Sequence, residues 1–186
     1  YNAAVPELFG FGQTTHTILE RLHQKYKDRI PTEEEIFNMV EDTFMLKHVF
    51  PSNDPVNRPG SYERAKKLVH EIMKKYVNTY SADFCRIRQD EARFELLVDE
   101  ALITGSIDLL LKEDEARNIN AAEVIDFKSM EVPDELEKFD WREMSLQVQL
   151  YSRAAKEVIG ENAETGYVHT LKNNKRVEVP VDANSI

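Results

Sequence analysis

The stretch ALITGSIDLLLKEDEARNINAAEVIDFK, residues 101–128, decides the fold that this chain is expected to adopt. It predicts two strands, 101–111 and 122–128, joined by a polar loop that carries too much charge to be buried. Asp108 lies in the first strand and Asp126 in the second, each between two apolar neighbours. Because side chains alternate along a strand, Asp126 and Lys128 should project from the same face.

If the two strands pair as a hairpin, Asp108 comes to lie beside Asp126 and Lys128. Two carboxylates and an ammonium group would then share one site flanked by apolar residues, and half-buried like charges are unfavourable unless something pairs with them. A divalent cation is the natural partner, since oxygen-rich sites suit Mg²⁺ or Mn²⁺. The alternative is a solvated strand face, because an isolated Asp-x-Lys is common.

The composition describes a soluble globular protein. The 186 residues suffice for one domain with a real core, and 41% of them are hydrophobic while 31% are charged. The sequence has no apolar run of membrane-spanning length and no signal-peptide pattern, so we expect a cytoplasmic protein. Because the chain begins at Tyr1 without an initiator Met, we also expect that it is a fragment of a larger protein. The single cysteine, Cys85, excludes an internal disulfide and a cysteine-rich metal site.

The charge distribution bears on nucleic-acid binding. A formal net charge of −10 counts against tight independent binding to nucleic acid, whose affinity comes largely from Lys and Arg on phosphates. Two segments, 64–75 and 172–176, are nevertheless basic, whereas 32–42 and 131–143 are acidic. The composition therefore leaves room for a site that acts on DNA delivered by a neighbouring domain.

The order of elements predicts one α/β domain, residues 1–186, with a central mixed sheet of about five strands flanked by helices. Residues 1–80 should be mostly helical and 82–186 should form the sheet core. The expected helices run from Thr14 or Thr15 to about Asp28, from Pro31 to His48, from a Ser61 cap to about Tyr80, and from about Trp141 to Ile159. The remaining strands are expected at 91–98 and in a closing hairpin over 166–181, with the acidic segment 131–140 before the last helix.

Two polar features on the helices are weak signals by themselves. Gln147 and Tyr151 lie four residues apart and so share one helix face, where amide and phenol groups could contact a sugar–phosphate chain or a splayed base. Such a pair is usually helix surface. His16 lies in the first turn of the first helix, where a histidine is more often a capping or surface residue than a ligand.

Taken together, these motifs resemble the PD-(D/E)XK nuclease superfamily, which has a restriction-endonuclease-like fold. The sequence is similar in particular to its RecB-like branch, in which G-x-x-D, D/E-x-K and Q-x-x-x-Y follow one another, as do Gly105–Asp108, Asp126–Lys128 and Gln147–Tyr151 here. FGQTTHTILERLH, with His16, resembles the N-terminal motif of that branch. The resemblance spans about residues 9–170. Its nearest relatives would be nuclease domains fused to UvrD/Rep-type helicases, including the AddA and RecB subunits.

The resemblance implies a role for each matching residue. His16, Asp108, Asp126 and the main-chain carbonyl of Phe127 would bind Mg²⁺ or Mn²⁺. Lys128 would position and help deprotonate the attacking water and offset charge in the transition state. Asp108, Asp126 and Lys128 are thus the expected catalytic residues. The last helix would supply the groups that orient the DNA, Gln147 and Tyr151.

The resemblance also implies a cellular setting. We expect an exonuclease domain of a helicase–nuclease in DNA recombination and repair, acting on single-stranded DNA or duplex ends. Its partner would be a covalently linked or associated UvrD/Rep-type helicase, and its location the nucleoid of a prokaryotic cytoplasm. Some relatives carry an iron–sulfur cluster on four cysteines, whereas Cys85 alone implies a protein without one. Glu91 matches no motif residue and is expected to be a surface residue with a supporting role at most.

Two other functions stay open from the sequence. The chain could be a catalytically inactive nuclease-fold domain that binds DNA or a partner, although its intact Asp108, Asp126 and Lys128 count against this. It could also be an unrelated acidic α/β interaction domain in which the motifs are accidental. The net charge of −10 favours that interpretation, and the order of the motifs counts against it.

Overall fold

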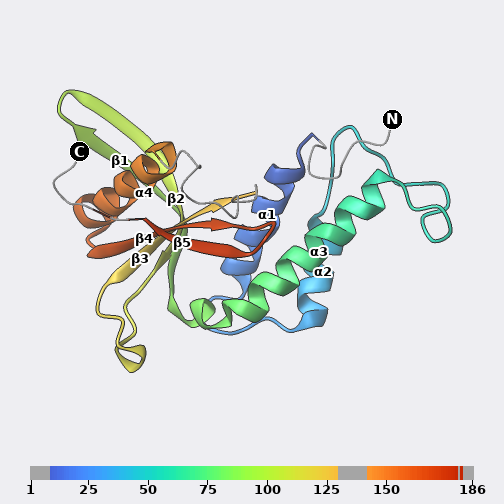
Figure 1. Ribbon diagram of the computed structural model, residues 1–186, viewed down its shortest axis with the longest axis horizontal. Helices are drawn as coiled ribbons and strands as arrows, with labels where there is room; N and C mark the ends of the chain where they lie inside the picture. Colours follow the sequence, from blue (N-terminus) through green and yellow to red (C-terminus); the bar gives the residue numbers. More distant parts are fainter. Residues whose placement is uncertain (1–8, 130–141, 180, 182–186) are drawn as a thin grey trace. The chain divides into compact units, whose positions relative to one another are not determined.

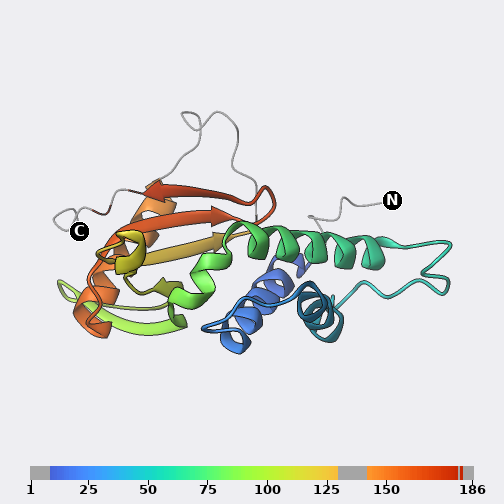
Figure 2. The same cartoon turned by 90° about the horizontal axis from the view of Figure 1, so that it is seen from below.

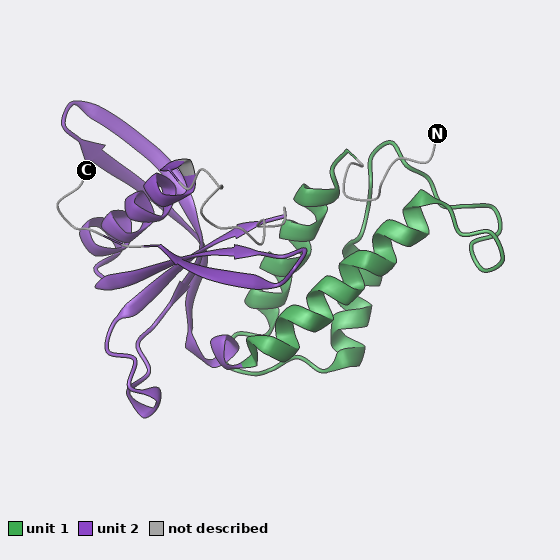
Figure 3. Cartoon of the chain, viewed as in Figure 1, with its two compact units in different colours: residues 1–81 green, residues 82–186 purple. Residues whose placement is uncertain are grey.

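Three helices make up the N-terminal part of the chain: α1 (Phe11–Lys25), α2 (Glu33–Thr43) and α3 (Ser61–Thr79) (Figure 1). The computed structural model describes residues 9–129, 142–179 and 181. The chain divides into two compact units, residues 1–81 and 82–186 (Figure 3). No helix in the described ranges is both long and apolar enough to cross a lipid bilayer.

The ends of the first two helices differ from the expected ones. Helix α1 begins three residues before Thr14 and ends before Asp28, whose φ of 74° is incompatible with a continuing right-handed helix. Helix α2 begins at the Thr32 capping box but ends at Thr43. The expectation that it continues to His48 is wrong because Phe44 adopts an extended conformation and is buried.

Helix α3 is capped by a carboxylate in place of the expected Ser61 hydroxyl. Gly60 is the N-cap, and its main-chain N–H donates to Glu63 Oε2 across 2.7 Å. The other carboxylate oxygen, Oε1, accepts from the N–H of Ser52 across 2.8 Å and so ties down the preceding loop. An acidic side chain in the first turn also suits the helix dipole.

A five-stranded mixed sheet organises the second unit, as expected from the sequence (Figure 2). Its strands lie side by side in sequence order: β1 (Ile87–Val98), β2 (Ala101–Leu111), β3 (Ala122–Lys128), β4 (Ala163–Thr170) and β5 (Lys175–Val179). Of the four strand pairs in the described residues, β3–β4 is parallel and the other three are antiparallel. Strands β2 and β3 have the expected bounds, whereas β1 begins four residues before the expected start at Glu91.

Helix α4 (Arg142–Ala154) lies in the connection that joins the parallel strands β3 and β4. The expected helix to Ile159 continues past Ala154 only as a π-helical turn, Ala155–Ile159. The acidic segment 131–140 and the expected helix start at Trp141 lie outside the described residues. Short 3-10 helices, η2 (Ser81–Arg86) and η3 (Glu115–Arg117), complete the unit.

Helix α4 packs directly on the sheet because a glycine in β4 makes room for it (Figure 1). A Cβ atom at Gly166 would overlap with Cγ1 of Val148 on the helix. Val148 is fully buried in a cluster that also contains Val124 and Val168. The close approach brings the polar side chains of α4 within reach of the end of β3.

Candidate active site

The β2–β3 hairpin places Asp108 beside the end of β3, as the sequence predicts. Leu109 pairs with Ile125 and Leu110 with Val124 in the antiparallel ladder. One step further along, the main-chain N–H of Phe127 donates to Asp108 Oδ2 across 2.7 Å. The carboxylate of Asp108 is therefore fixed next to the strand that carries Asp126.

Lys128 links this pair of acidic residues to helix α4. Its Nζ atom lies 2.9 Å from Asp126 Oδ2 and 3.1 Å from Oδ1, and it donates to Gln147 Oε1 across 2.8 Å. The amide group of Gln147 in turn donates to the hydroxyl of Tyr151 across 2.7 Å. A continuous chain of polar contacts thus runs from Asp126 to Tyr151.

The surroundings of the two aspartates disfavour their ionised forms. Burial, and then the charge of Asp126, raise the pKa of Asp108 to about 7, while the N–H of Phe127 acts against this rise. Burial also raises the pKa of Asp126, against the opposing effect of Lys128. Asp126 is only 1% exposed, and its Oδ2 atom has an ion-pair contact but no directed hydrogen bond from the described residues.

The glycine that begins the G-x-x-D pattern has a packing role. A Cβ atom at Gly105 would lie 2.8 Å from Cζ of Phe94 on the adjoining strand. The Phe94 ring meets the Tyr151 ring edge-on, with centroids 6.0 Å apart. Gly105 therefore makes space for the ring that packs against Tyr151. The Tyr151 hydroxyl is itself largely buried, and this burial is the main reason why its pKa is raised.

Glu91 on β1 is a site residue that no sequence motif identifies. Its neighbours Asp90 and Ala92 pair with Leu109 and Ile107, so Glu91 lies opposite Asp108. Glu91 is half-buried with a φ of 44°, which non-glycine residues seldom adopt. Its negative charge contributes to the raised pKa values of Asp108 and Tyr151. Only the register of β1 on β2 could have identified this residue.

A hydrogen bond from β2 holds the carboxylate of Glu91 in place. The hydroxyl of Ser106 on β2 donates to Glu91 Oε2 across 2.8 Å. Glu91 is thus anchored to the strand that carries Asp108. Its φ of 44° is a strained backbone conformation, and such strain is concentrated at functional sites. We interpret Glu91 as part of the acidic site.

Comparison with known families agrees with this geometry. A family model described as the PD-(D/E)XK nuclease superfamily matches residues 3–184. The chain belongs to the PD-(D/E)XK nuclease superfamily. No match to the chain was found among the curated proteins. Membership of the PD-(D/E)XK superfamily implies a nuclease that hydrolyses phosphodiester bonds, generally with a divalent metal such as Mg²⁺.

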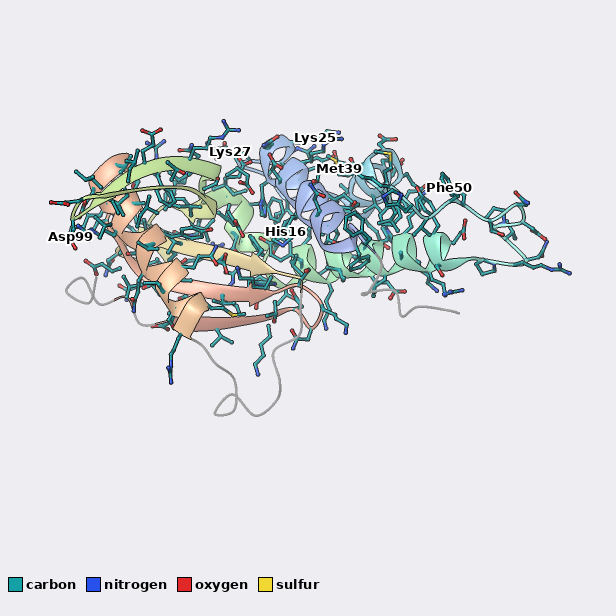
Figure 4. The ribbon with its side chains drawn as sticks, turned by 90° about the horizontal axis from the view of Figure 1, so that it is seen from above. His16, Lys25, Lys27, Met39, Phe50 and Asp99 are labelled. Atoms are coloured by element: carbon teal, nitrogen blue, oxygen red, sulfur yellow. The ribbon has the colours of Figure 1, made fainter. Side chains whose placement is uncertain are left out.

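Within the second unit, the structure brings together five of the residues that the PD-(D/E)XK motifs name. Asp108, Asp126, Lys128, Gln147 and Tyr151 share the site on the sheet and α4. His16 extends half-buried from α1, in the other compact unit (Figure 4). Its part in metal binding therefore stays a prediction.

The donors at this PD-(D/E)XK site fit a hard divalent ion. Asp108 and Asp126 offer carboxylate oxygens, which suit Mg²⁺ or Mn²⁺. In the described part of the chain, no group of three His, Cys, Asp or Glu side chains is arranged to hold an ion. Two carboxylates with main-chain oxygen suit Mg²⁺, because this ion usually keeps several of its waters.

Proposed function

We propose that this protein is a metal-dependent DNA nuclease whose Asp108 and Asp126 hold Mg²⁺ or Mn²⁺ and whose Lys128 assists the chemistry. The observation that carries the proposal is the position of Lys128 Nζ, 2.9 Å from Asp126 Oδ2. It is supported by a second buried carboxylate, Asp108, whose pKa is raised. A structural ion pair would need only one carboxylate. The second carboxylate, that of Asp108, is buried nearby at an electrostatically unfavourable position. A cation bound by oxygen atoms of both carboxylates explains its presence there.

The metal set would comprise Asp108, Asp126, the main-chain carbonyl of Phe127 and, from the motif resemblance, His16. When bound, the ion supplies a hydroxide nucleophile near neutral pH and neutralises charge on the phosphoryl oxygens. Glu91 adds negative charge next to Asp108 and so strengthens the attraction for a cation.

Lys128 is the cationic side chain at the proposed site. Held between Asp126 and Gln147, its ammonium group is oriented before substrate arrives. From there it positions the attacking water, its positive charge favours loss of a proton from that water to solvent, and it offsets negative charge that develops in the transition state. Gln147 and Tyr151 continue the polar row along α4 and orient the DNA strand.

The order of the motifs supports a finer proposal. The RecB-like pattern favours an exonuclease domain of a helicase–nuclease in recombination and repair, with a UvrD/Rep-type helicase as covalent or associated partner. The net charge of −10 supports delivery of DNA by such a partner, since the 34 Asp and Glu residues outnumber the 24 Lys and Arg residues that could bind phosphates. A nucleoid location in a prokaryotic cytoplasm follows from the same proposal.

Cleavage of end-labelled single-stranded and duplex DNA tests the proposal. Reactions with Mg²⁺, Mn²⁺ or EDTA are compared for the wild type and Asp126→Asn, which keeps the shape of the side chain while removing its charge. We expect cleavage with either ion, none in EDTA and none by the variant. Ends that shorten progressively would support the exonuclease assignment, and cleavage by Asp126→Asn at the wild-type rate would rule out the proposed site.

A further inference from the structure

The basic segment 172–176 forms the end of the β4–β5 hairpin, next to the end of β3 (Figure 2). Because β3 and β4 are parallel, their carboxyl ends lie at the same edge of the sheet. The main-chain N–H of Leu171, the first residue after β4, donates to the carbonyl of Lys128 across 2.8 Å. The turn is therefore attached to the residue that we assign to catalysis.

Hydrogen bonds within the turn fix its shape. The Thr170 hydroxyl lies 2.6 Å from Asn173 Oδ1 and 3.1 Å from the carbonyl oxygen of Lys175. Asn174 has a φ of 53° and is buried, with its Oδ1 atom 3.2 Å from Nε2 of His169. Since the backbone is held at both ends of the turn, side chains that leave it start from defined positions.

The register places Lys175 in line with Lys128. Lys128 pairs with Thr170 across β3 and β4, and Thr170 pairs with Lys175 across β4 and β5. Residues that pair directly project from the same face of a sheet. Neighbouring strands lie about 4.8 Å apart, so the Cα atoms of Lys175 and Lys128 are separated by about 10 Å.

A row four residues back along β3, which projects from the same face, shows which face this is. Val124, Gly166 and Val179 form that row, and the α4 residue Val148 packs on Gly166. Val124, Val148 and Val179 belong to one buried cluster. Lys175 is thus on the face that carries α4 and the two aspartates, two strands away from Lys128.

Lys175 and Arg176 differ in what they contact. The Arg176 guanidinium is directed into the unit, where its Nη2 atom lies 2.7 Å from Asp83 Oδ2, and its own role is structural. Lys175 has no carboxylate within ion-pair distance among the residues that the structure describes. Among the described residues, the charge of the Lys175 ammonium group is therefore not neutralised on the face that carries the two aspartates, in a chain with a net charge of −10.

We propose that Lys175 is a phosphate-binding residue that holds the DNA backbone at a phosphate flanking the scissile one. The proposal rests on the proposed nuclease function and adds to it a substrate contact on β5. A nucleic-acid strand bound with one phosphate at Asp126 and Lys128 can follow the row across β4 to Lys175. The lysine contributes to affinity and register, and it takes no part in bond breaking.

Binding measured without cleavage tests this contact. Fluorescence anisotropy of a labelled single strand and of the matching duplex is followed in EDTA between 50 and 200 mM salt, for the wild type, Lys175→Ala, Lys175→Arg and Lys156→Ala. Lys156 is the matched control, because it is exposed in the π-helical turn that precedes β4, at the opposite end of that strand. Both alanine variants remove one positive charge.

We expect Lys175→Ala to weaken binding on the order of fivefold and to reduce the slope of log K against log salt by about 0.7 for single strands or 0.9 for duplex. Lys175→Arg should keep the wild-type slope, and Lys156→Ala should differ from the wild type by less than about twofold. In cleavage assays with Mg²⁺, Lys175→Ala should raise KM and leave kcat nearly unchanged.

Two failures are distinguishable. If the wild type cleaves DNA but Lys175→Ala matches Lys156→Ala in affinity, salt slope and KM, the assignment of Lys175 is overturned and the nuclease function stands. A folded wild type that neither cleaves nor binds DNA overturns both. Circular dichroism of each variant confirms that the comparison is made between folded proteins.

Discussion

The main-chain N–H of Phe127 donates to the carboxylate of Asp108 across 2.7 Å, at the point where the backbone pairing of β2 with β3 has ended. The ladder between these strands closes with Leu109 and Ile125, and the side chain of Asp108 then takes the place of a backbone acceptor. The same contact fixes Asp108 against β3, the strand that carries Asp126. It therefore joins the folding of the hairpin to the assembly of the acidic site.

Replacement of Lys128 by alanine separates chemistry from metal binding. We expect Lys128→Ala to reduce single-turnover cleavage at least a thousandfold, because the positive charge beside Asp126 is lost. Affinity for Mg²⁺, measured by isothermal titration calorimetry, should be unchanged or higher, since a competing cation has been removed. Lys156→Ala serves as control, and equal cleavage by the two variants would exclude Lys128 from the mechanism.

The raised pKa of Asp108 predicts the pH dependence of stability without metal. Its folded-state pKa of about 7 exceeds the usual value of 3.8, so protonated Asp108 stabilises the fold fully below the usual value and this contribution is lost as pH rises through 7. Urea unfolding in EDTA should show a free energy about 1–3 kcal/mol lower at pH 8 than at pH 5. Saturating Mg²⁺ should restore it.

The matched variant for this prediction is Asp108→Asn, whose amide oxygen can still accept from the N–H of Phe127. Between pH 5 and pH 8 in EDTA, its unfolding free energy should change much less than that of the wild type. Mg²⁺ should stabilise it less as well. A variant with the same pH dependence as the wild type would show that another group is responsible.

The sequence predicts the two strands of the central hairpin to the residue, because their apolar runs are bounded by clear polar turns. It also brings Asp108 to Asp126, since only one hairpin register keeps the apolar faces buried. It does not reveal Glu91, whose position depends on the pairing of β1 with β2 and on a φ of 44°. Nor does it reveal that Lys175 aligns with Lys128, because the alignment passes through the parallel β3–β4 pair.

Glu91 is expected to tune the acidic site. Glu91→Gln removes a charge that contributes to the raised pKa of Asp108, so that pKa should fall below about 7. Loss of negative charge should also weaken Mn²⁺ binding about three- to tenfold, measured by calorimetry. Glu95→Gln, on an exposed position of the same strand, is the control. Identical affinities for the two variants would place Glu91 outside the metal site.

Tyr151 tests the contribution of the polar row on α4. Tyr151→Phe keeps the ring that packs on Phe94 but removes the hydroxyl that accepts from Gln147. We expect unchanged folding by circular dichroism and a roughly tenfold lower kcat/KM on DNA, about 1.4 kcal/mol of transition-state stabilisation. Tyr167→Phe also loses a hydroxyl contact, to Glu123 at 3.3 Å, and should retain wild-type cleavage. Full activity of Tyr151→Phe would remove this hydroxyl from substrate orientation.

Gly166 sets how closely α4 approaches the sheet, and hence where Gln147 and Tyr151 lie. Gly166→Ala places a methyl group onto Val148 Cγ1 and within 3.3 Å of Val124 Cγ2, both buried. Since neither side can yield without displacing the helix, we expect a loss of about 1–3 kcal/mol in unfolding free energy. Cleavage should fall as well, because Lys128 on β3 and Gln147 on α4 would separate.

A second substitution distinguishes this steric effect from a general intolerance of β4. In the double variant Gly166→Ala/Val148→Ala, the space that the new methyl group needs is vacated on the helix side. The loss of unfolding free energy in the double variant should be smaller than the sum of the two single-variant losses by about 1–2 kcal/mol. Part of the cleavage rate should return as well. Purely additive losses would mean that the contact between Gly166 and Val148 does not position α4.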